Sequence, residues 1–310
     1  MIETSVFGTC SDDILSAFTE HKGFSIRETL HTNVKEDNLP SCVKDTSTLP
    51  DEAAASEKCI VLSGINGTGF EVACEAIKKS KHLFVCDIFG TTPEKICKLK
   101  KLQKEAGVNI HFSRAGRLMP GIMAAKRVIR NPVLTELRGS IQLSDYDSQI
   151  SEIRELLFKM TDAVLTLIPS NHRKIHVKSS STRKGVIGLV SIRIEFENGS
   201  IANLLLTTVS EDKEVTARIY STGQSCSTDT SKSYITVSKI LFSKTGGSLK
   251  NITFPVKESK YLLKEEIKGY HSSITCKSGY SGNTEYVQRW VTLTHDILDK
   301  TVHSNHPGTD

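Results

Sequence analysis

Short apolar runs alternate with amphipathic stretches through the first third of the chain, which is the pattern of strands and helices in turn. The predicted strands are Ser5–Phe7, Phe24–His31, Lys58–Ser63, Leu83–Cys86 and Asn109–Ser113. The predicted helices are Asp12–Glu20, Glu71–Ser80 and Pro93–Ala106. The polar stretch 33–58 is expected to be mostly loop, with one short helix near Pro50. Repeated strand–helix–strand units predict a doubly wound parallel sheet with helices on both faces.

The pattern changes after about residue 118, where strands joined by short turns begin to dominate. The predicted strands here are Leu134–Gln142, Val186–Phe196, Ile201–Val209, Val215–Tyr220 and Tyr234–Leu241. Helices are predicted over Pro120–Ile129, Asp147–Leu167, Leu262–Ile274 and Asn283–Thr301. Asn198-Gly199 predicts a hairpin turn, because Asn-Gly accepts the positive φ that such a turn requires. A run of antiparallel strands needs one face covered, and these helices can supply the cover.

The chain is therefore predicted to be an α/β protein of two domains. Residues 1–118 are expected to form a Rossmann-like domain with a doubly wound parallel sheet. Residues 119–310 are expected to form an α+β domain with a large open, mostly antiparallel sheet closed by helices.

Composition and charge argue against two classes of function, membrane association and nucleic-acid binding. The 310 residues carry a net charge of +5, with 38% hydrophobic and 24% charged side chains, which is typical of a globular protein. The apolar runs are too short for a bilayer-spanning helix and no secretory signal is visible, so no membrane association is expected. Only 6% of the residues are aromatic and none interleave with a basic cluster, so nucleic-acid binding is not expected.

The eight cysteines are scattered along the chain. They form neither C-x-x-C pairs nor a Cys/His metal spacing, so we expect reduced thiols, no bound metal and a cytoplasmic location.

Four stretches resemble, in their residues and in their order along the chain, the sequence motifs of one known family. Lys81–Ile88 (KHLFVCDI) resembles the family's "GKHVFxEKP" strand, and Val108–Lys126 resembles its "RfnPa…aak" segment. Ile192–Leu205 resembles its "FenG..anl" hairpin, and Glu265–Lys300 resembles its closing helix pair. On these matches the chain resembles the glucose-fructose oxidoreductase / inositol dehydrogenase (Gfo/Idh/MocA) family over nearly its whole length. The resemblance implies an NAD(P)-binding type of first domain and a dehydrogenase-like second domain.

The resemblance also indicates which positions would carry chemistry. The family's lysine beside the nicotinamide and the substrate hydroxyl falls on Asp87. Its "HxxD" pair, which deprotonates the substrate, falls on Lys159 and Asp162. These three residues are positional equivalents of the catalytic groups. Since a desolvated lysine can act as a base, Lys159 could take over a lost role, or it could pair with Asp87.

The cofactor positions are altered as well. The family's "GxGxxG" phosphate loop begins at Gly8 and has Cys10 at its close-approach position. Asp12 and Asp13 follow, and their charge complements the helix dipole but would repel a pyrophosphate. Thr32 stands near the end of the second strand, where the family has an acid for the ribose hydroxyls.

Asn66 matches the asparagine of the family's "TPNxxH" loop, which here is the glycine-rich stretch 64–69. This stretch can be a flexible turn, or its backbone amides can contact a ligand.

Hydride transfer needs a held cofactor and a group that takes the hydroxyl proton, and both sets of positions differ from the family pattern. The leading hypothesis is a diverged family member without ordinary dehydrogenase activity that binds a sugar-like small molecule or a partner. The first alternative is an active NAD(P)-dependent oxidoreductase on a sugar, polyol or sugar nucleotide, with Lys159 or Asp162 as acid/base. The second is a structural subunit of a hetero-oligomer. Family members dimerise through the open sheet, which implies a homo-oligomer here.

Overall fold

The computed structural model describes residues 1–31, 43–45, 58–114, 119–142, 149–181, 187–210, 214–229, 232–243, 246–276 and 283–304. The chain forms two compact units. Unit 1 consists of Met1–Ser113 and Lys260–Val291, and unit 2 consists of Arg114–Ser259 and Thr292–Asp310. The division into domains 1–118 and 119–310 follows the sequence alone and stays a prediction. That prediction does not assign the later segment Lys260–Val291 to the first domain, whereas unit 1 contains it.

Unit 1 is built on a six-stranded sheet. Its strands are β1 (Ile2–Phe7), β2 (Phe24–His31), β3 (Val43–Asp45), β4 (Cys59–Leu62), β5 (His82–Val85) and β6 (Ile110–Phe112). Their order is β3-β2-β1-β4-β5-β6, and each neighbouring pair runs parallel, which confirms the predicted parallel sheet. The strand β3 lies in the polar stretch that was expected to be loop, and Pro50 lies outside the described residues.

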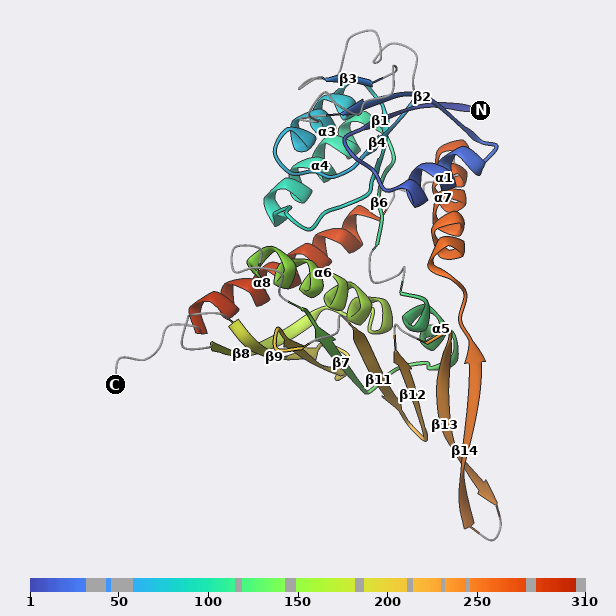
Figure 1. Ribbon diagram of the computed structural model, residues 1–310, viewed down its shortest axis with the longest axis vertical. Coiled ribbons are helices and arrows are strands. Elements are labelled where there is room, and N and C mark those ends of the chain that lie inside the picture. The colour runs from blue at the N-terminus through green and yellow to red at the C-terminus, as the bar shows by residue number, and fades with distance from the viewer. Residues whose placement is uncertain are drawn as a thin grey trace. The chain divides into compact units, whose positions relative to one another are not determined.

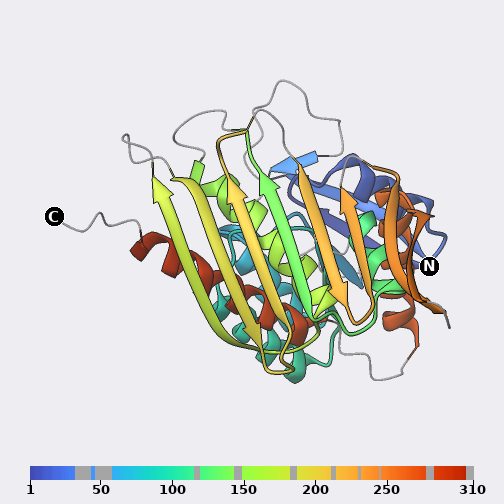
Figure 2. The same cartoon turned by 90° about the horizontal axis from the view of Figure 1, so that it is seen from below.

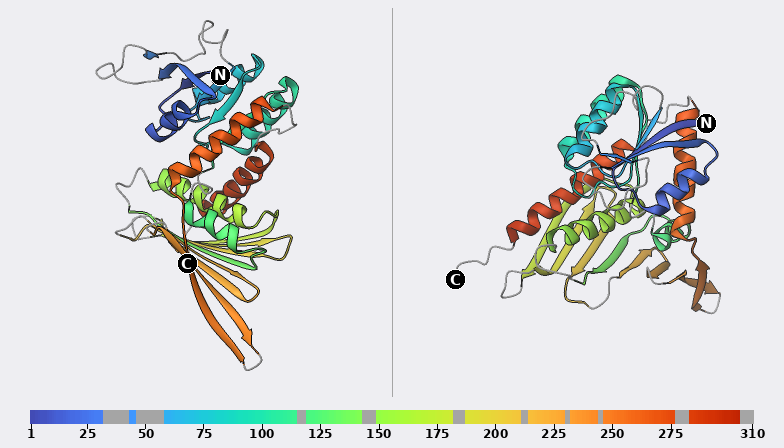
Figure 3. Two further views of the ribbon diagram at one scale, coloured as in Figure 1. Left: turned by 90° about the vertical axis from the view of Figure 1, so that its right-hand side faces the viewer. Right: turned by 45° about the horizontal axis from the view of Figure 1, so that its top comes forward.

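Helices cover both faces of this sheet, as the sequence predicts (Figure 1). They are α1 (Asp12–Glu20), α3 (Thr68–Lys78), α4 (Pro93–Ala106) and α7 (Ser259–Thr275). Helices α3 and α4 lie on one side, and α1 and α7 lie on the other (Figure 3). The ring of Phe84 on β5 contacts Phe18 of α1 and Tyr270 of α7, with centroids 5.0 and 5.3 Å apart. Because both faces are covered, all four residues of β4 are buried and apolar.

Side chains from the later segment hold the edge strand β6. Glu266 of α7 lies with Oε1 3.0 Å from His111 Nε2, and its Oε2 accepts from the Ser113 hydroxyl at 3.1 Å. Asn283 stands just before α8 (Thr284–Ser304) and accepts from the Phe112 N–H at 2.9 Å. Its amide also donates to the Phe112 carbonyl at 2.7 Å. A side-chain amide thus pairs with edge backbone groups that a further strand would otherwise use.

Unit 2 is built on an eight-stranded sheet with the order β14-β13-β12-β11-β7-β10-β9-β8. Its strands are β7 (Leu134–Ser140), β8 (His172–Ser181), β9 (Ile187–Phe196), β10 (Ile201–Thr207), β11 (Val215–Ser221), β12 (Gln224–Asp229), β13 (Tyr234–Ser243) and β14 (Gly246–Pro255). Strands β7 and β10 run parallel and all other neighbours run antiparallel. The predicted large, mostly antiparallel sheet is confirmed.

One face of this sheet is covered by α5 (Pro120–Val128) and α6 (Gln149–Leu167), which contact β7, β10, β12 and β13. Figure 2 shows the sheet from the opposite side. The alternation along β9 follows from this cover, since Val190, Ile192 and Ile194 are buried while Ser191 and Arg193 are exposed. Gly199 has φ +81° in the predicted turn between β9 and β10.

The strands predicted from the sequence do not include β8, β12 or β14. These strands carry few apolar residues, so the alternating pattern that marks a half-buried strand is weak. In β12, for example, Cys226 is the one fully buried side chain. Among the described residues, no helix is long and apolar enough to cross a membrane.

A buried ion pair fixes α6 within unit 2. Asp162 is fully buried, and its Oδ1 accepts from Arg114 Nε at 3.0 Å. The Arg114 guanidinium also donates to Thr166 one turn further along the helix. Beside this pair, the hydroxyls of Thr161 and Thr294 lie 2.7 Å apart and join α6 to α8.

We expect Asp162→Ala to lower the free energy of unfolding by about 3–5 kcal/mol, because it leaves the Arg114 charge buried without its carboxylate. Lys159→Ala is the matched control on the same helix. It removes a largely exposed pair with Glu155 and should cost no more than about 0.5 kcal/mol. Urea unfolding followed by circular dichroism measures both. Equal effects of the two substitutions would contradict a structural role for Asp162.

Candidate functional site

The strand order of unit 1 creates a crevice at the carboxyl ends of β1 and β4. The chain passes from β1 through α1 to β2 on one side, whereas β4 pairs with β1 on the other side. Parallel sheets bind ligands at such a topological switch point. A pocket of about 280 Å³ lies here. This switch-point pocket is lined by Phe7, Gly8, Thr9, Ser63, Gly64, Asn66, Thr68, Gly69 and Asp87.

Glycine is required at two places in the pocket wall. Gly8 has φ +87°, and a Cβ there would lie 2.0 Å from Ser63 Oγ. A Cβ on Gly69 would lie 2.2 Å from the Gly64 carbonyl oxygen. At Gly8 and at Gly69, the neighbouring atoms lie too close to leave room for a side chain. Close packing is one reason for these glycines, and their position in the wall also lets a ligand approach the backbone.

Asp87 stands just after β5 and is the one charged residue among those lining the switch-point pocket. Its Oδ1 accepts a hydrogen bond from the Phe89 N–H at 2.7 Å, which fixes the direction of the carboxylate. The remaining polar groups of the wall include the hydroxyls of Ser63 and Thr68 and the exposed amide of Asn66. The pocket is therefore polar and carries negative charge.

Cys10 is buried behind the first turn and does not line the switch-point pocket. Its sulfur lies 3.6 Å from that of Cys86, which follows β5. Asp12 and Asp13 form the exposed first turn of α1, and the N-cap residue Ser11 makes no side-chain capping bond. The start of α1 therefore carries two exposed acidic residues.

A second pocket, of about 270 Å³, lies beside α6 in unit 2. This α6 pocket is lined by Met119, Ser140, Ile141, Glu152, Glu155, Leu156, Lys159, Glu214 and Val215. The Lys159 ammonium forms an ion pair with Glu155 one turn earlier on the same helix. Three carboxylates and one ammonium thus face a single cavity. Asp162 is not among the lining residues, since its carboxylate is held by Arg114.

The structure brings some of the predicted site residues together. Gly8, Asn66 and Asp87 line the switch-point pocket, whereas Cys10 is buried and does not. Lys159 lines the α6 pocket of the other unit, so its pairing with Asp87 stays a prediction.

Thr32 lies outside the described residues. Sequence reasoning missed Ser63 and Thr68, although their places after a buried strand and at a helix start were available signals. It also missed Glu155 and Glu214, for which the sequence gave no signal.

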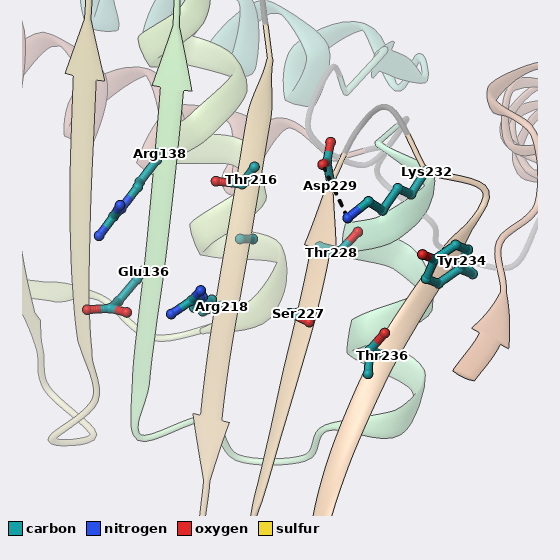
Figure 4. Close-up of a pocket in the computed structure, with 11 residues that line it drawn as sticks. Glu136, Arg138, Thr216, Arg218, Ser227, Thr228, Asp229, Lys232, Tyr234 and Thr236 are labelled. Carbon is teal, nitrogen blue, oxygen red and sulfur yellow. Dashed lines mark ion pairs between the residues drawn. The ribbon is translucent and has the colours of Figure 1, made fainter. Parts of the chain in front are cut away.

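A third pocket, of about 290 Å³, lies on the sheet of unit 2. Figure 4 shows its lining residues, which come from β7, β11, β12 and β13, with Lys232 from the segment between β12 and β13. The register sets Glu136 opposite Arg218, and Arg218 opposite Ser227. This row alternates with the buried residues Leu137 and Cys226, so it belongs to the face away from α5 and α6.

Within the described part of the chain, no group of three or more His, Cys, Asp or Glu side chains is arranged to hold a metal ion.

Comparison with solved structures identifies similar folds. UDP-N-acetylglucosamine 3-dehydrogenase GnnA from Acidithiobacillus ferrooxidans superposes with a TM-score of 0.82 at 13% identity, covering 99% of both chains. The dehydrogenase MviM from Clostridium difficile gives 0.70 at 15% identity, covering 98% of this chain and 99% of its own. An oxidoreductase from Thermotoga maritima gives 0.73 at 14%, covering 97% and 96%.

A scan against protein-family models and a search of curated proteins gave no match. At sequence identities of 13–15%, the similarity to these structures concerns the fold alone. The chain has the two-part fold of NAD(P)-dependent oxidoreductases of the Gfo/Idh/MocA type.

Proposed function

We propose that this protein binds an uncharged, hydroxyl-rich small molecule in the switch-point pocket and lacks ordinary dehydrogenase activity. The observation that carries the proposal is the charge of that pocket. Its one charged lining residue is the carboxylate of Asp87, at the position where the sequence resemblance implies a catalytic lysine. A carboxylate ionised at neutral pH cannot donate the proton or supply the positive charge that such a lysine provides.

The electrostatics also oppose a dinucleotide. A pyrophosphate at the start of α1 would face Asp12 and Asp13, with Asp87 in the adjoining pocket wall. Each carboxylate about 4 Å from a phosphate charge costs on the order of 1 kcal/mol in water, and more where solvent is excluded. The carboxylates at the start of α1 and in the pocket wall therefore oppose binding of the pyrophosphate of NAD or NADP.

The same wall suits a neutral polyol or sugar. Ser63 and Thr68 can donate or accept hydrogen bonds, and the Asn66 amide can do both. The oriented Asp87 carboxylate accepts hydrogen bonds from hydroxyls without any charge penalty from the ligand. Such a set of groups recognises hydroxyl donors better than it recognises anions.

The alternative function is an active NAD(P)-dependent oxidoreductase on a sugar, polyol or sugar nucleotide. The observation in its favour is Lys159, which lines the α6 pocket beside Glu155. A lysine paired with a glutamate in a cavity can exchange protons with a substrate hydroxyl. The role of Asp162 in this alternative is weakened by its burial against Arg114.

Calorimetric titration with NAD, NADH, NADP and NADPH tests the proposal. We expect no saturable binding with a Kd below about 1 mM. Replacing both acids of the first turn (Asp12→Asn with Asp13→Asn) should strengthen binding, by about fivefold for each 1 kcal/mol of repulsion removed. Glu20→Gln removes one carboxylate from the other end of α1, away from the pocket, and should leave cofactor binding unchanged. Micromolar binding by the natural chain would favour the oxidoreductase instead.

We further propose that the protein forms a homo-oligomer through the uncovered face of the eight-stranded sheet, and that it is cytoplasmic. Support for the interface comes from side chains on that face that are apolar and solvent-accessible. Leu189 of β9 is 39% exposed, and Leu205 of β10 is half-buried on the same face.

Leu205→Glu should weaken self-association by at least about tenfold, because it buries a charge in the proposed interface. Val209→Glu is the control, since Val209 is exposed but lies beyond the end of β10. Analytical ultracentrifugation measures both variants. A natural chain that stays monomeric at high micromolar concentration would contradict this interface.

A further inference from the structure

Two cysteines from distant parts of the sequence lie in contact, each next in the chain to a residue that lines the switch-point pocket. The Cys10 sulfur is 3.6 Å from the Cys86 sulfur, although 76 residues separate them in the sequence. Cys10 follows β1 and Cys86 follows β5, so the strand order brings them to the same edge of the sheet. Closing this gap to a disulfide requires the sulfurs to approach by roughly 1.5 Å.

The environments of the two thiols differ. Hydrogen bonding from Cys86 lowers the pKa of Cys10, and Cys10 also immediately precedes the N-cap of α1, where a thiolate is favoured. The same hydrogen bond, together with burial and the neighbouring Asp87 charge, raises the pKa of Cys86 well above its ordinary value. By contrast, Cys59 on β4 is fully buried, and burial raises its pKa to about 12. Cys10 is thus the thiol that ionises more readily, and the Cys86 sulfur lies in contact with it.

We propose that Cys10 and Cys86 are a redox pair that peroxide converts reversibly to an intramolecular disulfide. The Cys10 thiolate attacks one oxygen of hydrogen peroxide and becomes a sulfenic acid, and the other oxygen leaves as water after protonation. The Cys86 sulfur then attacks the Cys10 sulfur, and the sulfenic oxygen leaves as a second water. Two thiols are oxidised by two electrons and one peroxide is reduced to two waters.

Oxidation of the cysteine pair would affect the pocket through the lining residues that lie near the two cysteines in the chain. Cys10 is two residues after Gly8, and Cys86 immediately precedes Asp87, and both Gly8 and Asp87 line the switch-point pocket. A disulfide between them would tie the turn after β1 to the end of β5 and restrict both. The inference goes beyond ligand binding and does not depend on which ligand the pocket takes.

Peptide mapping of the natural chain tests the inference directly. The reduced protein is treated with hydrogen peroxide, its remaining thiols are alkylated, and it is digested without reductant for mass spectrometry. We expect a cross-linked pair of peptides containing Cys10 and Cys86, which dithiothreitol separates again. In the oxidised form, amide hydrogen exchange at Thr9 and Ser11 should be severalfold slower than in the reduced form.

Variants distinguish a pair from single reactive thiols. Cys86→Ser should leave Cys10 as a sulfenic acid that dimedone labels, and Cys10→Ser should leave Cys86 unoxidised. Cys276→Ser removes an exposed thiol on the segment after α7 and should not affect the cross-link. The inference is overturned if both cysteines of the natural chain remain alkylatable after peroxide, or if either one cross-links mainly to another cysteine. Because these readouts use no ligand, a failure here leaves the proposed binding function standing.

Discussion

The position of β1 between β2 and β4 is the constraint on which the rest of unit 1 depends. Because β1 pairs in parallel with a strand on each side, the connections after β1 and after β4 leave in opposite directions. Their separation opens the edge of the sheet. Gly8, Ser63 and Asp87 become neighbours for this reason alone, although they lie far apart in the sequence. The candidate ligand site and the cysteine pair both result from this strand order.

The later segment of the chain completes the same unit. Tyr270 covers the Phe84 ring from α7, and the buried Glu266 accepts from Ser113 just beyond β6. Asn283 pairs with both backbone groups of Phe112. The parallel sheet is thus stabilised by residues that are 153 to 171 positions from their partners at its last strand, so unit 1 is not a contiguous stretch of sequence.

The sequence predicted well those elements whose signals are local. Asp12–Glu20 and Pro93–Ala106 were predicted to the residue, because an acidic first turn begins the one and Gly107, with φ +65°, ends the other. Strands such as β12 and β14 were missed because they gain their stability from cross-strand pairing more than from burial. Strands as polar as these lack a clear apolar periodicity.

The residues of the candidate site also differ in whether the sequence could predict them. The resemblance identified Gly8, Asn66 and Asp87 by position, and the structure brings these three to one pocket. The contact between Cys10 and Cys86 could not be predicted from spacing, since it exists only once β1, β4 and β5 are ordered. Likewise, the burial of Asp162 against Arg114 depends on tertiary packing that a helix pattern does not contain.

We propose that a pyrophosphate adds no favourable binding energy in the switch-point pocket. Calorimetric titration with adenosine and with ADP tests it most directly, because the two ligands share a nucleoside and differ in the charged group. We expect ADP to bind no more tightly than adenosine, and we expect a higher salt concentration to reduce any disadvantage of ADP. Binding of ADP at least about tenfold tighter than adenosine, a gain of about 1.4 kcal/mol, would contradict it.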